Sequence, residues 1–351
     1  MYYQKTSSFP LFISGTEGYD TFRIPALITL PGGRVLAFAE GRRFSASDTG
    51  DIDIVLRISD DGGQTFSPLK VIASGEGSTA GNPCPAYDTI TGQILMMFNR
   101  NHTEGHQYLI EQGKSPRTVH LTVSNDNGDT WTPEQDITAQ TKLPHWTWHA
   151  VGPNHALQLA SGRLLFPCNH AEFLENEGKS GPYRSHTLYS DDHGQTWQIG
   201  EDIADDTTEC VLSQLKDGRV LINIRLLPCP GCRSMATSHD DGVTFIDHHL
   251  VEVQPDPGCQ GSMIVLTSGN QEYILVTNST ATNARKRLAL HESADNGESW
   301  SEAFVITEGP CAYSDLAQLD DNHIAVLYEA GEEYSHETIT FDIITMNRTG
   351  I

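Results

Sequence analysis

The sequence predicts an all-β protein, a six-bladed β-propeller, and two repeated patterns carry this prediction. One is an apolar run, a turn and a second apolar run, repeated six times. The other is an eight-residue box, Ser-x-Asp-x-Gly-x-Thr-Trp/Phe. No long helical pattern or low-complexity linker interrupts them, and repetition at this spacing is typical of propellers. The boxes begin at Ser59, Ser124, Ser190, Ser238 and Ser293.

Each box has the composition of a tight turn. Its Asp can accept hydrogen bonds from the backbone that follows, its Gly tolerates a positive φ, and its last residue is an apolar aromatic. Only the last copy departs from the pattern, with Ser299 where the others have Thr. The copies are too alike and too far apart to be five active sites, so we interpret them as structural.

The paired apolar runs predict β-hairpins. The first spans 25–39, PALITLPGGRVLAFA. After each of the first five pairs an alternating strand leads into a box, as Ile52, Ile54 and Leu56 illustrate. The other pairs span 84–99, 155–168, 210–225, 262–278 (around Ser268-Gly269-Asn270) and 315–329.

The repeating unit is therefore a hairpin, a third strand, a box and a fourth strand. Six units in 351 residues average roughly 58 residues each, as in four-stranded propeller blades. The sixth unit ends at 338–346 without a box, and Phe9–Ile13 is predicted to supply its missing strand and close the ring. We expect one domain over residues 1–351.

Composition excludes several classes of function. The net charge of −24 argues against a nucleic-acid or anionic-membrane surface. No run of 18 apolar residues predicts a membrane span. The first eleven residues lack the basic start and apolar stretch of a secretory signal, which predicts a cytoplasmic protein unless an export signal was removed.

The seven cysteines do not predict a disulfide framework, since their number is odd and they are scattered from Cys84 to Cys311. Cys229 and Cys232 form a lone CxxC with no second pair at zinc-like spacing. We expect free or incidentally paired thiols, with no metal and no cofactor; a metal or redox site at the CxxC is the alternative.

Antiparallel order within a unit sorts the polar residues between two faces. Arg34, Arg163 and Arg219 lie at hairpin turns, on the face of the boxes, and are expected to be solvated. A second set lies where first and third strands begin and second strands end. Because strand ends converge near a propeller axis, this set is expected to share one cavity; ordinary salt-bridged loop residues are the alternative. Its members are Arg23, Glu40, Arg42, Arg43, Asp48, Asn82, Glu209, Arg225, Gln260, Arg285, Tyr313 and Glu329.

Several motifs resemble those of one enzyme family. Residues 22–25 carry the Phe-Arg-Ile-Pro motif of sialidases (exo-α-neuraminidases), in which the boxes, called Asp boxes, are a second hallmark. The resemblance covers nearly the whole chain and is strongest to the animal cytosolic-type enzymes. The motifs shared with that subgroup lie at 82–85, 208–210, 258–262, 311–316 and 327–329.

The resemblance implies a role for each residue of the set. The arginine triad would be Arg23, Arg225 and Arg285, with Arg287 as a competitor for the last place. Tyr313 would be the nucleophile, Glu209 its base, Asp48 the general acid/base, and Glu329 the residue that holds Arg23. Either Arg42 or Arg43 would be a further substrate arginine, and Asn82 and Gln260 would contact the sugar.

These residue types suit the chemistry of an acidic sugar. Three guanidinium groups can bind the carboxylate of sialic acid by charge-assisted bonds. A neutral phenol avoids bringing an anionic nucleophile to an anionic centre, but with a reference pKa of about 10 it needs a base. The arginines are expected to favour ionised carboxylate and phenolate.

The predicted function is retaining hydrolysis of terminal α-linked sialic acid, or a related nonulosonic acid, from oligosaccharide, glycoprotein or glycolipid. A catalytically silent propeller that binds acidic glycans, and a trans-sialidase, are the alternatives. Trp146 and Trp148 either line an aglycone site or pack in the core, and packing is favoured. Linkage preference, aglycone type and oligomeric state are left open.

Overall fold

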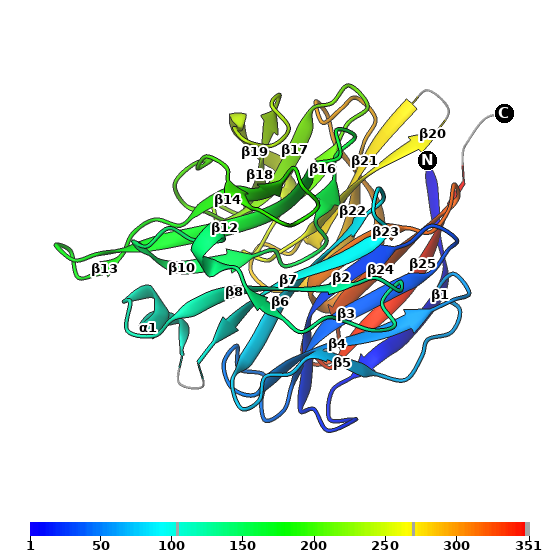
Figure 1. Cartoon of the computed structure of the whole chain (residues 1–351). Helices are drawn as coiled ribbons and strands as arrows, with labels where there is room; N and C mark the ends of the chain where they lie inside the picture. The colour runs from blue at the N-terminus through cyan, green and yellow to red at the C-terminus, as the bar shows by residue number, and fades with distance from the viewer. Residues whose placement is uncertain (103–104, 269–270, 348–351) are drawn as a thin grey trace.

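The computed structural model describes residues 1–102, 105–268 and 271–347, and this part of the chain is all-β, as predicted (Figure 1). Its helices are the short α1 (Gln107–Glu111) and α2 (Thr138–Thr141). Neither is long or apolar enough to cross a membrane. The strands form four hydrogen-bonded sheets.

The first sheet contains β2 (Thr21–Thr29), β3 (Val35–Arg42), β4 (Ile52–Ser59), β5 (Lys70–Ala73), β6 (Thr79–Asp88), β7 (Gln93–Asn101), β8 (Arg117–Ser124) and β9 (Gln135–Asp136). The second contains β10 (Trp146–Val151), β11 (Leu157–Gln158), β12 (Leu164–Leu174), β13 (Lys179–Ser180), β14 (Arg184–Ser190) and β15 (Gln198–Ile199). The third contains β16 (Thr207–Gln214), β17 (Val220–Leu226), β18 (Cys232–Ser238) and β19 (Ile246–Pro255). The fourth contains β1 (Tyr2–Ile13), β20 (Ser262–Ser268), β21 (Gln271–Ser279), β22 (Lys286–Ser293), β23 (Ser301–Gln318), β24 (His323–Ala330) and β25 (Thr338–Asn347).

The larger sheets are made of antiparallel groups. In the first, β2–β5 and β6–β9 are joined by one parallel pair, Ile52 with Thr79. In the fourth, the first half of β23 pairs with β22 and its second half with β24. All six predicted hairpins pair as antiparallel strands, although Gly269 and Asn270 of one turn lie outside the described residues.

The two ends of the described chain are hydrogen-bonded to each other. Strand β1 pairs antiparallel with β25, with Phe9 opposite Phe341 and Ile13 opposite Thr338 (Figure 1, blue and red). The predicted pairing of Phe9–Ile13 with the last unit is confirmed. The strand begins at Tyr2, earlier than predicted. Its first half is mostly polar, and exposed residues alternate there with buried or half-buried ones, so this part does not stand out as an apolar run in the sequence.

The box turns are closed by hydrogen bonds between their own residues. In the first copy, Ser59 Oγ donates to Asp61 Oδ1 (2.7 Å) and accepts from the Gly63 amide (2.8 Å). Asp61 also accepts from the Thr65 amide (2.9 Å) and hydroxyl (2.6 Å). These bonds, with that hydroxyl bond as the main cause, lower the pKa of Asp61 to about 2. The other four copies repeat the pattern, and Ser299 supplies the missing Thr hydroxyl.

Glycine is required at the fifth box position for two reasons. Gly63 has φ +87°, a conformation that other residues rarely adopt, and a Cβ there would lie 2.7 Å from the ring of Phe341. The closing aromatic, Phe66, packs on the same ring with centroids 5.0 Å apart. The turn thus anchors one group of strands on the next.

The turn arginines are not freely solvated, which corrects that expectation. Arg34 pairs with Asp129 (2.6 Å) and Arg163 with Asp191 (2.7 Å), so both bind box residues. Arg219 pairs with Asp217 of its own turn (2.8 Å). The boxes are rich in acidic residues, so an arginine in a neighbouring turn has a carboxylate within ion-pair distance.

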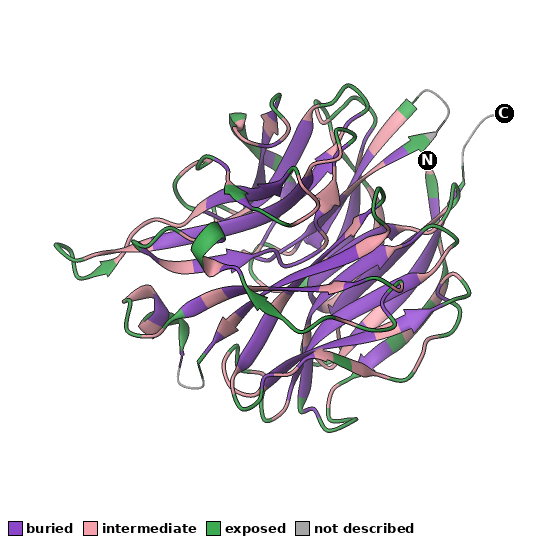
Figure 2. Ribbon diagram, in the orientation of Figure 1, coloured by how far each residue is buried: buried purple, intermediate pink, exposed green. Residues whose placement is uncertain are grey.

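The strand interiors are buried and the connections are exposed (Figure 2). Apolar clusters join neighbouring groups of strands; one contains Leu27 of β2, Val55 of β4, Leu327 of β24 and Phe341 of β25. All seven cysteines lie in the described residues and are free thiols, as expected. Cys229 and Cys232 are therefore not bonded to each other.

Candidate active site

β-bulges direct four of the predicted site residues. A bulge adds a residue to one strand, bends it and re-aims its side chains. Strands β2, β6 and β16 each begin an antiparallel group and have a register shift near their start. Strand β23 has such a shift where its second half begins to pair with β24. The shifts fall at Arg23/Ala26, Gly81/Cys84, Thr207/Cys210 and Cys311/Ser314. The first begins directly after Arg23, and the others enclose Asn82, Glu209 and Tyr313.

Glu329 organises the first of these bulges. Its carboxylate, fully buried, accepts two bonds from the Arg23 guanidinium, from Nε at 2.8 Å and from Nη2 at 3.1 Å. It also accepts from the amide of Ile24 (2.8 Å). Ile24 has φ +57°, a strained value for a β-branched residue, and this hydrogen bond holds it there. The structure thus brings Glu329 and Arg23 together as predicted.

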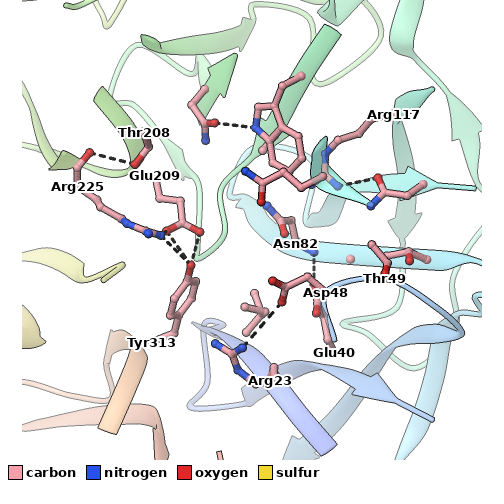
Figure 3. Close-up of a pocket in the computed structure, with 18 of the residues that line it drawn as sticks. Arg23, Glu40, Asp48, Thr49, Asn82, Arg117, Thr208, Glu209, Arg225 and Tyr313 are labelled. Atoms are coloured by element: carbon pink, nitrogen blue, oxygen red, sulfur yellow. Dashed lines mark hydrogen bonds and ion pairs between the residues drawn. The ribbon is translucent and has the colours of Figure 1, made fainter. Parts of the chain in front are cut away.

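Tyr313 and Glu209 form the centre of the site (Figure 3). The phenol donates to both carboxylate oxygens, at 2.6 and 2.8 Å. Arg225 Nη1 donates to Glu209 (2.5 Å) and to the phenol oxygen (3.1 Å). The guanidinium carbons of Arg23 and Arg285 lie 5.6 and 5.5 Å from the centre of the Tyr313 ring. Residues from β2, β16, β17, β23 and the β21–β22 connection therefore converge on one phenol.

Arg225 and Arg285 favour the phenolate of Tyr313, as expected, but they do not ionise it in this structure. Burial raises the pKa of Tyr313 well above its usual value, and the charge of Glu209 adds to the rise. Arg225 and Arg285 oppose these effects without outweighing them. Tyr313 is therefore a neutral phenol at physiological pH, and its proton already points at Glu209.

Asp48 lies across the pocket from Glu209, in the β3–β4 connection (Figure 3). It pairs with Arg42 Nη1 (2.7 Å) and lies 3.9 Å from Arg23 Nη1. The side chain of Asp48 is largely exposed. The loss of some water there favours the protonated acid, but the charges of Arg42 and Arg23 outweigh this effect and lower the pKa of Asp48. Glu40 holds Arg42 through Nη2 (2.6 Å) and accepts from the Asn82 amide (2.8 Å).

Three predicted residues lie elsewhere. Arg43 turns away from the pocket, pairs with buried Asp53 (2.5 Å) and lies over the ring of Tyr19, which leaves Arg42 as the pocket arginine of that pair. Arg287 binds Glu302 outside the pocket, so Arg285 is the pocket residue.

Gln260 was expected to contact the sugar, but its side chain is buried and does not line the pocket. Its Nε2 donates to the carbonyl of Gly261 (2.7 Å), and its Oε1 accepts from the Ser314 amide (3.2 Å). Gln260 therefore supports the backbone next to Tyr313 from behind.

One wall of the pocket was missed by the sequence analysis. Arg117, at the start of β8, is buried and lies 4.4 Å above the ring of Trp148. It donates to the His149 carbonyl (2.8 Å) and to Asn101 (2.7 Å), and burial lowers its pKa to about 10. No carboxylate of the described residues lies within ion-pair distance of it. The rule that third strands begin on the pocket face would have found Arg117.

The pocket is a cavity of about 220 Å³, and its lining includes Arg23, Glu40, Arg42, Asp48, Asn82, Arg117, Glu209, Arg225, Arg285 and Tyr313. Trp148 contributes to its wall, whereas Trp146 is buried against histidine rings, so the packing interpretation holds only for Trp146. The cavity combines three arginines around a phenol with an acid on the opposite side. Such an arrangement can bind a carboxylate and transfer protons on both sides of the atom next to it.

Comparisons with known proteins show which family and fold this chain resembles. Residues 33–326 match the BNR repeat-like domain family. Mouse Sialidase-2 is 31% identical over 370 residues, which cover 96% of this chain and 95% of the mouse protein. The solved structure of the Hadza microbial sialidase Hz136 superposes with a TM-score of 0.86 at 25% identity, covering 96% of this chain and 68% of that one. An intramolecular trans-sialidase from Ruminococcus gnavus shares the fold, with a TM-score of 0.80 at 16% identity over 97% of this chain and 98% of that one.

Proposed function

This chain belongs to the sialidase family of glycoside hydrolases, and we propose that it is a retaining exo-α-sialidase acting through a tyrosyl intermediate. Its substrates would be glycans ending in α-linked sialic acid or a related nonulosonic acid. The observation that carries the proposal is the short hydrogen bond from the Tyr313 phenol to Glu209 (2.6 Å) inside an arginine cluster. A site that only binds the sugar needs the arginines but has no use for a phenol paired with a base.

The proposal gives each residue a step. Arg23, Arg225 and Arg285 would bind the substrate carboxylate and so place the anomeric carbon next to the Tyr313 oxygen. Because this phenol is neutral, its proton would move to Glu209 as the C–O bond forms. Glu329 is a positioning residue, since it touches Arg23 and the backbone but not the pocket's reacting atoms.

Asp48 would supply the proton for the leaving oxygen and later remove one from water. The charges of Arg42 and Arg23 favour the ionised form of Asp48. A bound substrate carboxylate would offset part of their charge and raise the pKa of Asp48 towards the value that a general acid needs. Binding and protonation of Asp48 would thus be coupled. The two displacements at one carbon give net retention.

The direct test is an assay with a fluorogenic α-sialoside, followed by NMR of the sugar at early times. The proposal expects turnover and the retained anomer as the first product. No hydrolysis would favour a glycan-binding protein, and the inverted anomer would exclude the tyrosyl intermediate. A sialylated product in the presence of excess lactose would favour a trans-sialidase.

We also propose that residues 1–351 form one domain, a six-bladed β-propeller. The pairings support six antiparallel groups: β2–β5, β6–β9, β10–β15, β16–β19, β20 to the first half of β23, and its second half with β24, β25 and β1. Six apolar clusters each join neighbouring groups, and one of them joins the first group to the sixth. An experimental structure with a gap between those two groups, or two separate calorimetric transitions, would contradict this proposal. The cytoplasmic location stays a prediction.

A further inference from the structure

A buried cluster of possible metal ligands lies in the second sheet, outside the pocket. His149, Cys168 and His186 stand on the adjacent strands β10, β12 and β14 and are fully buried (Figure 1). Cys168 lies opposite His186, and His149 lies opposite His170, which follows Cys168 by two residues on β12. All three side chains therefore share one face of the sheet. One ligand atom from each lies within 4.8 Å of the others.

The ring nitrogens of this cluster lack partners. Three buried ring nitrogens have no hydrogen-bond partner among the described residues: Nδ1 and Nε2 of His149, and Nε2 of His186. His186 Nδ1 is taken by His170 Nδ1, at 3.1 Å. Buried polar atoms are nearly always paired, so each exception requires an explanation.

We propose that His149, Cys168 and His186 form a buried binding site for a monovalent soft metal ion, Cu(I). Two imidazoles and one thiolate suit a thiophilic ion of the late transition series. On binding, the Cys168 thiol gives its proton to solvent as the S–Cu bond forms, and the metal is neither oxidised nor reduced. This site does not depend on the proposed sialidase mechanism.

Charge and ligand number favour Cu(I) over Zn(II). A structural zinc site has four protein ligands, and the cluster offers three among the described residues. Arg117 Nε donates to the carbonyl of His149 (2.8 Å), and Lys142 Nζ donates to the carbonyl of Arg117 (3.0 Å). Next to these two cations, Cu(I) with one thiolate is neutral, whereas Zn(II) would leave a buried positive charge that nothing offsets.

Trp146 offers an optical signal for occupancy. Its ring stacks on His170 with centroids 3.6 Å apart, and the ring of His186 lies 4.9 Å away. A heavy ion bound to His186 is expected to quench its fluorescence. The three ligands lie on separate strands and form no short sequence motif. The sequence analysis therefore considered only the CxxC as a possible metal site and expected no metal.

The test is an anaerobic titration of the whole chain with Cu(I), buffered by the chelator bicinchoninate. We expect one tightly bound Cu(I) per chain, quenching that a Trp146→Phe variant lacks, and a rise in Tm of about 3 °C. Cys168→Ala and His186→Gln should each weaken binding at least tenfold. Cys210→Ala is the matched control, since this buried thiol contacts the Cys168 carbonyl (3.6 Å) but is not a member of the cluster.

X-ray absorption on the loaded wild-type protein keeps the test independent of whether a variant folds. One sulfur and two nitrogen neighbours would support the site. A shell of sulfur atoms alone would overturn it, because the ion would then be held by other thiols. No stoichiometric Cu(I), unchanged binding in Cys168→Ala, or tighter binding of Zn(II) than Cu(I) would also overturn it.

Discussion

The box turns and the pocket use the same kinds of residue in opposite ways. In a box, an aspartate binds residues within four positions of itself, as Asp61 binds Ser59 and Thr65. In the pocket, Glu329 binds Arg23 across 306 positions, and Glu209 binds Tyr313 across 104. The carboxylate of Asp61 is exposed and completes a turn, whereas those of Glu329 and Glu209 hold arginines and a phenol in a recess. We therefore expect the box residues to affect stability and the pocket residues to affect activity.

The largest effect on activity is expected when the phenol of Tyr313 is removed from the pocket. Tyr313→Phe should lower kcat by about 10³-fold or more, because the ring stays while the nucleophile is lost. The Tm should not change. Steady-state kinetics with an aryl sialoside and a thermal melt measure both quantities.

Tyr183→Phe is the matched control, because Tyr183 also lines the pocket and donates its phenol proton to a glutamate, Glu111. It lacks the surrounding arginine triad, so its loss should cost far less activity. Equal effects of the two variants would remove Tyr313 from its role.

Asp48→Asn should separate protonation of the leaving group from nucleophilic attack. On an unactivated sialyl-oligosaccharide the rate should fall about 10²- to 10³-fold, since general acid catalysis is worth that much. With a nitrophenyl leaving group the loss should be much smaller. Asp51→Asn, in the same connection but paired with Arg43, should leave both rates unchanged. A loss that does not depend on the leaving group would argue against the acid role.

Glu329→Gln should weaken a pocket contact between residues that are far apart in the sequence, Glu329 and Arg23. We expect KM to rise about tenfold, equivalent to about 1.4 kcal/mol of binding, because Arg23 loses its fixed orientation. Glu302→Gln removes a similar bidentate partner from Arg287 outside the pocket and should leave KM unchanged. An unaltered KM in Glu329→Gln would exclude its positioning role.

The smallest expected effect lies in the boxes and concerns stability alone. Hydrogen bonds, above all the one from the Thr hydroxyl, lower the pKa of Asp61 and Asp126 to about 2, below the usual value of an aspartate. Their stabilisation is therefore complete above pH 4 and is lost as the pH falls towards 2. A double variant, Asp61→Asn with Asp126→Asn, should show a weaker dependence of Tm on pH in this range. Its activity at neutral pH should equal that of the wild type.

Much of the architecture could be predicted because it repeats. Five boxes and six hairpins gave the strand order, and that order placed Arg23, Arg225, Arg285 and Tyr313 on one face. The exceptions depend on the direction of single side chains. Arg42 and Arg43 are neighbours in the sequence, yet a strand sends them to opposite sides, one to the pocket and one to Asp53.

Gln260 and Arg117 show what pattern and resemblance cannot supply. Gln260 lies in a shared motif, but its side chain turns behind Tyr313 to the backbone. Arg117 lies in no shared motif, and only the start of β8 on the pocket face places it there. The sign of the Tyr313 pKa shift was also unpredictable, since it depends on how far burial outweighs the arginines.

The pairing of β1 with β25 has a consequence for biosynthesis. Arg23 is synthesised well before Tyr313, Glu329 and the strand that covers β24, since Glu329 follows Arg23 by 306 positions. Contacts between residues so distant in the chain form slowly, because a long loop must close first. A nascent chain that stops before residue 329 can hold every box turn and still lack the Glu329 carboxylate that binds Arg23, so we expect no catalysis before that residue has been added.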